Sequence, residues 1–361
     1  MAFYHSKYSG RSRKVRPGLR KVILTVLLLL ILASLVIGYL LYQVVMKPNV
    51  WTPDQKEIVI YIPTGSDYGD VKRILYEKGL IIHRNNFEWL AKEKKYPDLI
   101  KPGRYTIEHG WSNDRLINLL RSGNQTPVNL TFNNVRDVYQ LSHRVSQQIE
   151  ADSASVAQLL TDSIYIGMMG FDRLTIPSLF IPNTYEFYWT TNAEGFVSRM
   201  LQEYRKFWNE ERKAKAADIK MSELEVSILA SIIDKETNKD NEKERMAGVY
   251  MNRLKSGWRL QADPTLVFAA GDFSLRRVLD VHKTIESPYN TYKYPGLPPG
   301  PICIPSIASI DAVLNYEAHN YYFFCAKDDF SGYHVFARTN LEHELNAWKY
   351  RRALDRMNIK K

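Results

Sequence analysis

The chain has 361 residues, of which 45% are hydrophobic, so it is long enough for about two domains and a sizeable core. Its formal net charge of +10 would by itself be compatible with nucleic-acid binding. However, residues 1–21 contain seven Lys and Arg and no Asp or Glu, so the remaining 340 residues carry only +3. The basic charge belongs to an N-terminal tail, and nucleic acid is therefore not an expected partner.

A long apolar run follows the basic tail. Residues 22–41 are aliphatic except for four positions, and the run continues weakly to Met46. Twenty apolar residues in a helix span the hydrocarbon core of a bilayer. A cleaved signal peptide is the alternative, but its apolar region has about 7–15 residues and ends in small residues such as Ala-x-Ala. We therefore expect an uncleaved transmembrane helix over 22–46, with residues 1–21 cytoplasmic and everything after Lys47 outside, by the positive-inside rule.

The chain contains only two cysteines, Cys303 and Cys325. A small secreted domain stapled by disulfides would contain more. The two could form one bridge in an oxidising compartment, but two small buried hydrophobic residues are the simpler interpretation, which we favour. We expect neither a metal nor an organic cofactor.

Residues 57–132, after a polar linker at 47–55, alternate between strand and helix signals. The strands are expected over 57–62, 103–107 and 128–132, and the helices are opened by Asp67, by Asn85 or Asn86, and by Ser112, with Gly79 and Gly123 past the ends of two of them. The order β-α-α-β-α-β predicts a small α+β module.

Residues 133 to about 220 are expected to be mainly helical. The interruption near 177–189 is too aromatic and too rich in proline for a helix interior, so a buried loop or a short strand is expected there. Residues 206–220 predict a charged, solvated surface helix.

The segment from Ser222 to Asn238 predicts a helix with an unusual carboxylate. Ser222 and Glu225 form a capping-box signature at its start. Helical periodicity places Glu236 on the apolar stripe, at the C-terminal end, whereas Asp234 lies on the opposite face.

A carboxylate on an apolar stripe is costly to ionise. Desolvation raises the pKa of Glu236, and the negative end of the helix dipole acts in the same direction. A glutamic acid tuned in this way can protonate a glycosidic oxygen. The alternative is a Glu at a frayed helix end, bonded to backbone or paired with Lys or Arg, and spacing alone leaves both open.

Two more helices are expected after this one, over 241–254 and from Asp263 onward. Asp263 followed by Pro264 is typical of an N-cap and the first helical residue. Gln261, just before, has no such obvious structural role.

The loop over 288–301 combines aromatic residues with Asn, Thr and Pro. The rings of Tyr289 and Tyr292 could stack on sugars and Asn290 could bond hydroxyl groups, although a rigid surface loop is the alternative. Strands over 321–326 and 333–336 predict a hairpin.

Together these motifs closely resemble one family, the MltG/YceG-like endolytic murein transglycosylases. The resemblance covers residues 22 to about 350 in order and spacing. The matching segments are 230–237, 252–254, 260–265, 289–292 and 296–302, with Gly332, His334 and Phe336 in a late hairpin, Phe180 and 182–185 in an upstream loop, and Lys101, Gly103 and Tyr105 in a LysM-like module.

The resemblance implies an inner-membrane enzyme that acts on peptidoglycan glycan strands, with peptidoglycan synthases as further partners. In that family the MurNAc–GlcNAc bond breaks without water, because the 6-hydroxyl of MurNAc attacks its own C1 and leaves a 1,6-anhydro end. One glutamate acts first as acid and then as base, and it falls on Glu236. Ordinary glycosidases use two carboxylates, but a nucleophile on the substrate makes the second unnecessary.

Five residues are candidates for holding the saccharide or orienting Glu236: Gln261, Asp263, Tyr289, Asn290 and Tyr292. The chain departs from the usual family pattern at Asn183, where Asp is common, at Asp234, where Glu is common, and over 317–320. A hydrolytic muramidase and a non-catalytic peptidoglycan-binding scaffold remain the alternative functions.

The expected fold is α+β, with one transmembrane helix, a small LysM-like module and a mixed helical and β catalytic domain. The expected parts are a basic cytoplasmic tail at 1–21, the membrane helix at 22–46, the LysM-like module at 47–132, a helical connecting region at 133–220, the catalytic domain at 221–350 and a C-terminal tail at 351–361.

Overall fold

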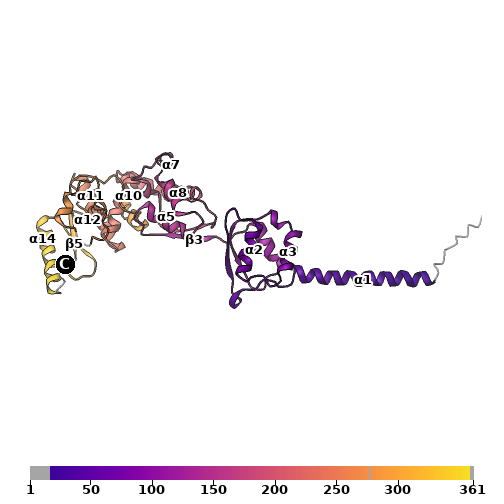
Figure 1. Cartoon of the computed structure of the whole chain (residues 1–361). Helices are drawn as coiled ribbons and strands as arrows, with labels where there is room; N and C mark the ends of the chain where they lie inside the picture. Colours follow the sequence, from indigo (N-terminus) through magenta and orange to yellow (C-terminus); the bar gives the residue numbers. More distant parts are fainter. Residues whose placement is uncertain (1–16, 276–277, 358–361) are drawn as a thin grey trace, which may run out of the picture. The chain divides into compact units, whose positions relative to one another are not determined.

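A computed structural model describes residues 17–275 and 278–357 of the chain (Figure 1). Most of the predicted basic tail, residues 1–16, lies outside the described residues. The chain divides into two compact units, residues 1–126 and 127–361, called here the first and the second unit. The expected α+β class is confirmed, since fourteen α-helices and three two-stranded antiparallel sheets occur in the described residues.

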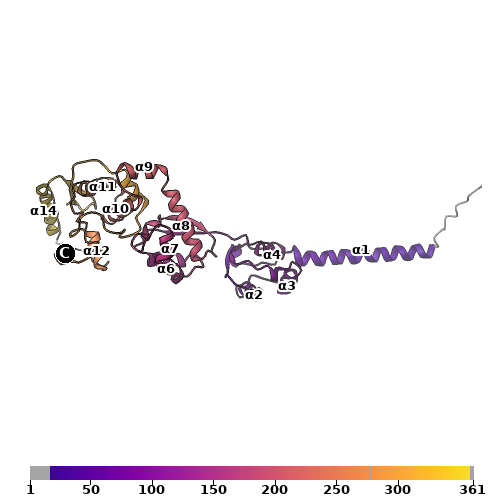
Figure 2. The ribbon, with the colours of Figure 1, turned by 90° about the horizontal axis from the view of Figure 1, so that it is seen from above.

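The first unit begins with the long helix α1, Pro17–Val45. Residues Gly18–Val45 of it are long and apolar enough to cross a membrane, and their apolar 18-residue window is not buried in the protein. The C-terminal end of α1 packs against α3 and α4 (Figures 1 and 2). The residues after it do not form a free linker, because Val50 pairs with Ile81 and is buried.

The rest of the first unit is a two-stranded sheet with three helices. The strands β1, Ile58–Ile62, and β2, Gly103–Ile107, are antiparallel, and Ile58 is opposite Ile107. The other elements are η1 (Pro53–Gln55), α2 (Tyr68–Glu77), α3 (Arg84–Glu93), η2 (Tyr96–Asp98) and α4 (Asn113–Ser122).

The helix caps of this unit follow the sequence closely. Asp67 caps α2 within a capping box, and Ser112 and Gly123 cap the two ends of α4 as predicted. For α3 the predicted cap, Asn85 or Asn86, was wrong by two or three residues. The N-cap is His83, which makes no side-chain cap hydrogen bond, and the helix begins at Arg84 because the bridge around Ile81 delivers the chain there.

The strand expected to close the first module belongs to the second unit instead. It has the predicted bounds, β3, Val128–Phe132, but it pairs with β4, Asn183–Phe187. The physical reason is that its inward side chains find their apolar partners there: the ring of Phe132 stacks on that of Tyr185 at 5.8 Å. The predicted buried loop or short strand near 177–189 is thus a strand, β4.

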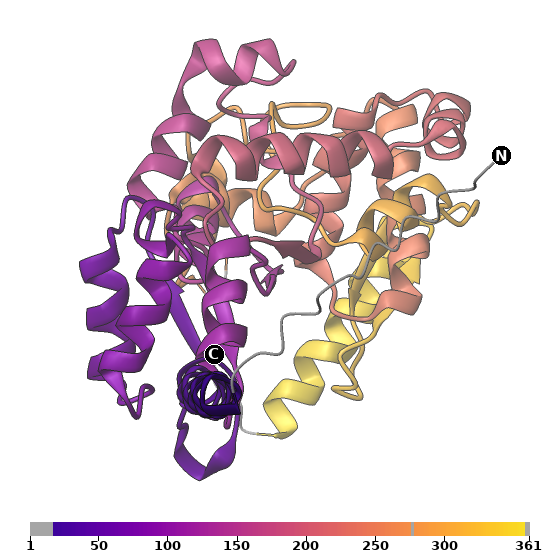
Figure 3. The ribbon, with the colours of Figure 1, turned by 90° about the vertical axis from the view of Figure 1, so that its right-hand side faces the viewer.

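The second unit contains two hydrophobic cores. Its remaining elements are α5 (Val138–Ser146), α6 (Ser153–Thr161), α7 (Ser163–Met168), η3 (Ile176–Leu179), α8 (Ala193–Phe207), α9 (Glu210–Asp218), α10 (Glu223–Glu236), α11 (Asp240–Lys255), α12 (Asp263–Ala270), η4 (Asp280–Thr284), α13 (Ile307–Leu314), β5 (Phe323–Ala326), β6 (His334–Ala337) and α14 (Asn340–Arg356). The yellow helix in Figure 3, α14, runs beside the β5–β6 hairpin.

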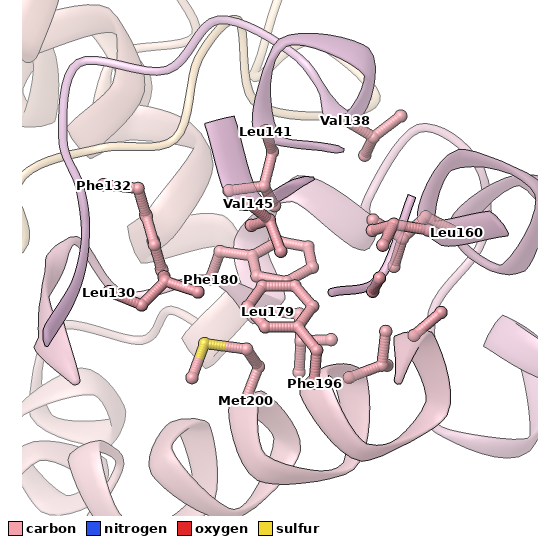
Figure 4. Packing of buried hydrophobic residues seen from close by; sticks show 14 of the residues in the cluster. Leu130, Phe132, Val138, Leu141, Val145, Leu160, Leu179, Phe180, Phe196 and Met200 are labelled. Atoms are coloured by element: carbon pink, nitrogen blue, oxygen red, sulfur yellow. The ribbon is translucent and has the colours of Figure 1, made fainter. Parts of the chain in front are cut away.

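One core lies among β3, β4 and helices α5 to α8 (Figure 4). Phe180 stacks on Phe196 with the ring centroids 6.0 Å apart, and Leu141 and Met200 close the cluster. The aromatic segment around Phe180 is therefore part of the hydrophobic core of the second unit.

The other core surrounds α10, which is buried along most of its length between α11, α12 and α13. Of the two cysteines, both with free thiols, Cys303 is buried beside α10 and Cys325 is partly exposed on β5. The buried helix delivers its last residue, Glu236, to the site described next.

Candidate active site

The end of α10 brings one carboxyl group out of the core. Ser222 caps the start of this helix in a capping box with Glu225, as predicted. Residues Val226 to Ile233 are all buried, and the helix ends at Glu236 because Thr237 adopts an extended backbone. Glu236 keeps partial contact with solvent.

The carboxyl group of Glu236 is bonded to a buried tyrosine of α11. The hydroxyl of Tyr250 donates to Oε1 of Glu236 at 2.5 Å. Burial and the neighbouring Glu236 raise the pKa of Tyr250, so this hydroxyl keeps its proton and acts as a donor.

A buried arginine of the same helix lies behind this pair. Arg253 donates from Nε to the carbonyl of Tyr322 at 2.8 Å and from a guanidinium NH to the carbonyl of Leu260. The hydrogen-bond partners of the Arg253 guanidinium are thus backbone carbonyl oxygens. Its positive charge acts on Glu236 from a distance and not through a direct ion pair.

Asp263 lies near Glu236 but does not cap its helix. It is the first residue of α12, Ala262 is the N-cap, and Pro264 follows at the second position. The predicted capping role was therefore wrong. Asp263 is exposed, and the hydroxyl of Tyr292 donates to its Oδ1 at 2.5 Å.

These groups set the protonation of Glu236. Burial raises its pKa from 4.5 to about 7, and the negative charge of Asp263 acts in the same direction. The hydrogen bond from Tyr250 and the charge of Arg253 oppose this rise. Glu236 therefore holds its proton to much higher pH than an ordinary glutamate does.

Two cavities meet at this carboxyl group, and Glu236 and Asp263 line both of them. The larger, about 830 Å³, is lined further by side chains that include Arg136, Lys235, Phe268 and Phe273. The smaller, about 390 Å³, is lined further by Arg253, Gln261, Tyr292, Phe323, Asn340 and His343, among others. A chain-like ligand therefore has room on both sides of the acid.

The structure brings together three of the five predicted binding residues. Asp263 lines both cavities, and Gln261 and Tyr292 line the smaller one. Gln261 has a left-handed backbone, φ 50°, and its amide N–H donates to the carbonyl of Thr291 at 3.0 Å.

The other two predicted binding residues hold the loop in place. Asn290 is fully buried, and its amide donates to the carbonyls of Lys283 and Ile285 at 3.0 and 2.8 Å. Tyr289 is buried against Phe268, with ring centroids 4.6 Å apart. Neither lines the two cavities beside Glu236.

The sequence placed Tyr250 only within the helix expected over 241–254, and Arg253 only within the family motif at 252–254. A signal for Tyr250 existed, because a buried tyrosine hydroxyl needs a hydrogen-bond partner. No comparable local signal marks Asn340 and His343, which reach the smaller cavity from α14.

The neighbouring carboxylate, Asp234, faces away from the site as predicted. It accepts hydrogen bonds from the hydroxyls of Ser306 and Ser309 at 2.5 and 2.7 Å, which attaches α10 to the start of α13. Residues 17–275 and 278–357 contain no group of three His, Cys, Asp or Glu side chains arranged for a metal. The chemistry that the site offers is proton transfer by one carboxyl group with a pKa near neutrality.

A named enzyme is among the curated relatives of this chain. It is 28% identical over 329 residues to the endolytic murein transglycosylase of Bacillus subtilis (strain 168), with 87% of this chain and 90% of the relative aligned. The protein of the same name from Streptococcus pneumoniae (strain D39) is 27% identical over 343 residues, covering 86% of this chain and 61% of that longer relative.

The fold and the sequence signature agree with these relatives. A solved structure of a YceG-like protein from Listeria monocytogenes has 26% sequence identity and a TM-score of 0.56, with 81% of this chain and 99% of that chain covered. The sequence model of the YceG-like family matches residues 60–349. This range includes Glu236, which lines both cavities. This match spans most of the chain, and the protein belongs to the YceG-like family.

Proposed function

We propose that this protein is a membrane-anchored endolytic lytic transglycosylase that cleaves the MurNAc–GlcNAc bond of nascent peptidoglycan and leaves 1,6-anhydro-MurNAc ends. The observation that carries the proposal is a carboxyl group, Glu236, with a pKa of about 7 at the junction of two cavities. The two relatives named endolytic murein transglycosylases support the same reaction. Such cleavage would end the elongation of a glycan strand.

In this proposal Glu236 handles one proton in two steps. As the protonated acid, it donates to the bridging oxygen while the bond from that oxygen to C1 of MurNAc breaks, and the GlcNAc end leaves with the proton. The resulting carboxylate then accepts the proton of the MurNAc 6-hydroxyl, whose oxygen bonds to C1. The acid is regenerated and no water is consumed.

Tyr250 and Asp263 shift the pKa of Glu236 in opposite directions and would favour different steps of this cycle. The hydroxyl of Tyr250 stabilises the carboxylate that forms after the first step. The charge of Asp263 favours the protonated acid before it and would also stabilise positive charge developing at C1.

Sugar binding is assigned to the cavity walls. We propose that Gln261, Asp263 and Tyr292 contact the saccharide, since all three line the smaller cavity. Tyr289 and Asn290, proposed from sequence as contacts, would act by holding the loop that carries Tyr292, because the Asn290 side-chain oxygen accepts the amide N–H of Tyr292 at 3.0 Å.

The same proposal gives roles to the basic tail, the apolar helix and the LysM-like module. Residues 22–46 would cross the inner membrane, residues 1–21 would lie in the cytoplasm, and the cavities would face the periplasmic or outer side. The LysM-like module would lie beside nascent strands, and peptidoglycan synthases would supply them. A supporting observation is the 28-residue apolar helix Gly18–Val45.

The test compares Glu236→Gln with Glu244→Gln in the full chain. Both changes replace Glu by Gln, but Glu244 is exposed on α11 and lines neither cavity. Purified glycan strands are incubated with each protein, and the products are identified by mass spectrometry. We expect the rate for Glu236→Gln to fall by about 10²–10⁴, because the proton donor is lost, and Glu244→Gln to match the wild type.

The products decide between the proposal and its alternatives. Ends that are heavier than the anhydro form by one water would show a hydrolytic muramidase. A wild-type protein that binds strands but releases no fragments would show a scaffold. Near-normal cleavage by a folded Glu236→Gln protein would eliminate Glu236 as the acid–base.

A further inference from the structure

Three large apolar side chains of the first unit are exposed around the end of α1. Trp51, Ile82 and Trp89 have exposed fractions of 47%, 53% and 45%. Trp51 and Ile82 each follow a partner of the isolated bridge between Val50 and Ile81, and Trp89 lies in α3, which begins just after that bridge. The bridge joins the segments that carry Trp51 and Ile82, and α3, which carries Trp89, contacts α1. Exposed apolar side chains on such neighbouring segments are typical of a contact surface.

Buried hydrogen bonds join the end of α1 to this same place. The side-chain amide of Asn113 donates to the carbonyl of Val44 at 2.8 Å, and its oxygen accepts from the amide of Asn49 at 2.6 Å. The side-chain oxygen of Asn49 accepts the N–H of His83 at 2.7 Å, and its carbonyl accepts the N–H of Ile82 at 3.0 Å. Both asparagines are buried, so the segments that carry Trp51 and Ile82 are tied to the end of α1.

Apolar packing reinforces this attachment. Val44 and Val45, the last two residues of α1, pack against the hydrophobic core of the first unit. The end of α1 is therefore attached to the module by apolar packing as well as by hydrogen bonds.

The length of α1 sets the height of this place relative to a bilayer. Residues 22–41 form roughly 30 Å of helix, which matches the hydrocarbon core. The four residues 42–45 add roughly 6 Å, which is about the thickness of the polar layer on one side. The end of α1 therefore lies among the lipid headgroups when the helix crosses a membrane, and Trp side chains favour that level.

We propose that Trp51, Ile82 and Trp89 form a membrane-contact face that inserts into the boundary between headgroups and acyl chains beside α1. The occupant is phospholipid, because the buried attachment to α1 brings this face to the bilayer surface. Lys47 precedes Trp51 in the chain and Arg84 follows Ile82, and both are exposed, so they supply positive charge for lipid phosphate groups. The Arg84 guanidinium lies over the ring of Tyr76, 4.4 Å from its centroid. This inference rests on α1 crossing a membrane and does not depend on the transglycosylase activity.

The test uses tryptophan fluorescence of the full chain in vesicles whose phospholipid acyl chains carry bromine, a contact quencher. The membrane-spanning residues 22–46 contain no tryptophan, so quenching reports on tryptophans at the surface. We expect partial quenching of the wild type, because two of its seven tryptophans lie on this face, and a large loss of that quenching in the Trp51→Phe, Trp89→Phe double variant. The matched control is Trp348→Phe, since Trp348 is 49% exposed on α14.

Two results would overturn the proposal. One is equal quenching of the wild type and the double variant. The other is that brominated lipid does not quench the fluorescence of Trp51 and Trp89, whereas the water-soluble quencher acrylamide does. Phe at these exposed positions retains an apolar ring, and circular dichroism of each variant checks that the fold is intact.

Discussion

At the scale of single residues, the protonation of Glu236 is a balance between burial and a small number of partners. Burial alone would keep the carboxyl group neutral, so the acid form would be abundant at neutral pH but would be a weak proton donor. The hydrogen bond from Tyr250 and the charge of Arg253 lower the pKa, and the balance lies at about 7. The role proposed for Glu236, first as acid and then as base, is best served by a pKa near that value.

Replacing Tyr250 by Phe should raise the pKa of Glu236. The hydrogen bond stabilises the charged form, so its loss favours the protonated form. A hydrogen bond to a charged group contributes roughly 1.5–3 kcal/mol, and about 1.4 kcal/mol corresponds to one pH unit. The basic limb of the kcat/KM profile on glycan strands should therefore move to higher pH by about one unit or more.

Tyr204→Phe provides the control for this measurement. The hydroxyl of Tyr204 donates to Glu223 at 3.1 Å in the same unit, and neither residue lines the two cavities. Its loss should leave the pH profile in place. A basic limb that stays fixed or moves to lower pH in Tyr250→Phe would show that this hydrogen bond does not tune the acid.

At the scale of elements, the loop before α13 is held close to two distant parts of the second unit. The N–H of Ile302 donates to the hydroxyl of Ser231 on α10 at 3.0 Å, and Ile302 lines the larger cavity. Two residues earlier, Gly300 passes the backbone near Leu174, and a Cβ there would lie 2.2 Å from the Leu174 carbonyl oxygen. Only glycine permits this approach.

Gly300→Ala should therefore destabilise the second unit. A methyl group forced against a backbone oxygen requires the loop or its neighbour to shift, which typically costs about 1–3 kcal/mol. The expected result is a lower Tm in thermal unfolding followed by circular dichroism. In Gly167→Ala the new Cβ meets no heavy atom within 4 Å, and this control should leave Tm unchanged or slightly raised. Equal effects of the two changes would contradict the close approach.

At the scale of the whole molecule, the chain combines an apolar helix with a unit that holds the candidate active site. The helix Gly18–Val45 has the length and composition of a single membrane span. The seven basic residues within 1–21 favour retention of that end in the cytoplasm. The cavities around Glu236 would then lie on the side where peptidoglycan is assembled.

Protease protection in cells stripped of their wall tests this orientation. A peptide tag at the N-terminus should resist a protease added outside, because the positive-inside rule places residues 1–21 in the cytoplasm. Residues 127–361 should be accessible to the same protease. Lysing the cells provides the control, since the tag must then be digested. A tag that is digested in intact cells would reverse the proposed topology.

The sequence by itself determined the features that depend on neighbours along the chain. The apolar run at 22–41, the caps at Asp67, Ser112 and Ser222, and the place of Glu236 on an apolar helical stripe are set by residues within a few positions of one another. Local hydrogen bonding and helical periodicity are sufficient to predict such features.

Only the tertiary structure decided the pairings between distant segments. It paired β3 with β4, although the sequence placed these strands in different domains. It also showed the hydrogen bonds from Tyr250 to Glu236 and from Tyr292 to Asp263, and the burial of Asn290 within its own loop. The physical reason is that these contacts form between elements whose relative positions follow from core packing. Spacing along a helix or strand shows which face a side chain occupies, but not which residue meets it there.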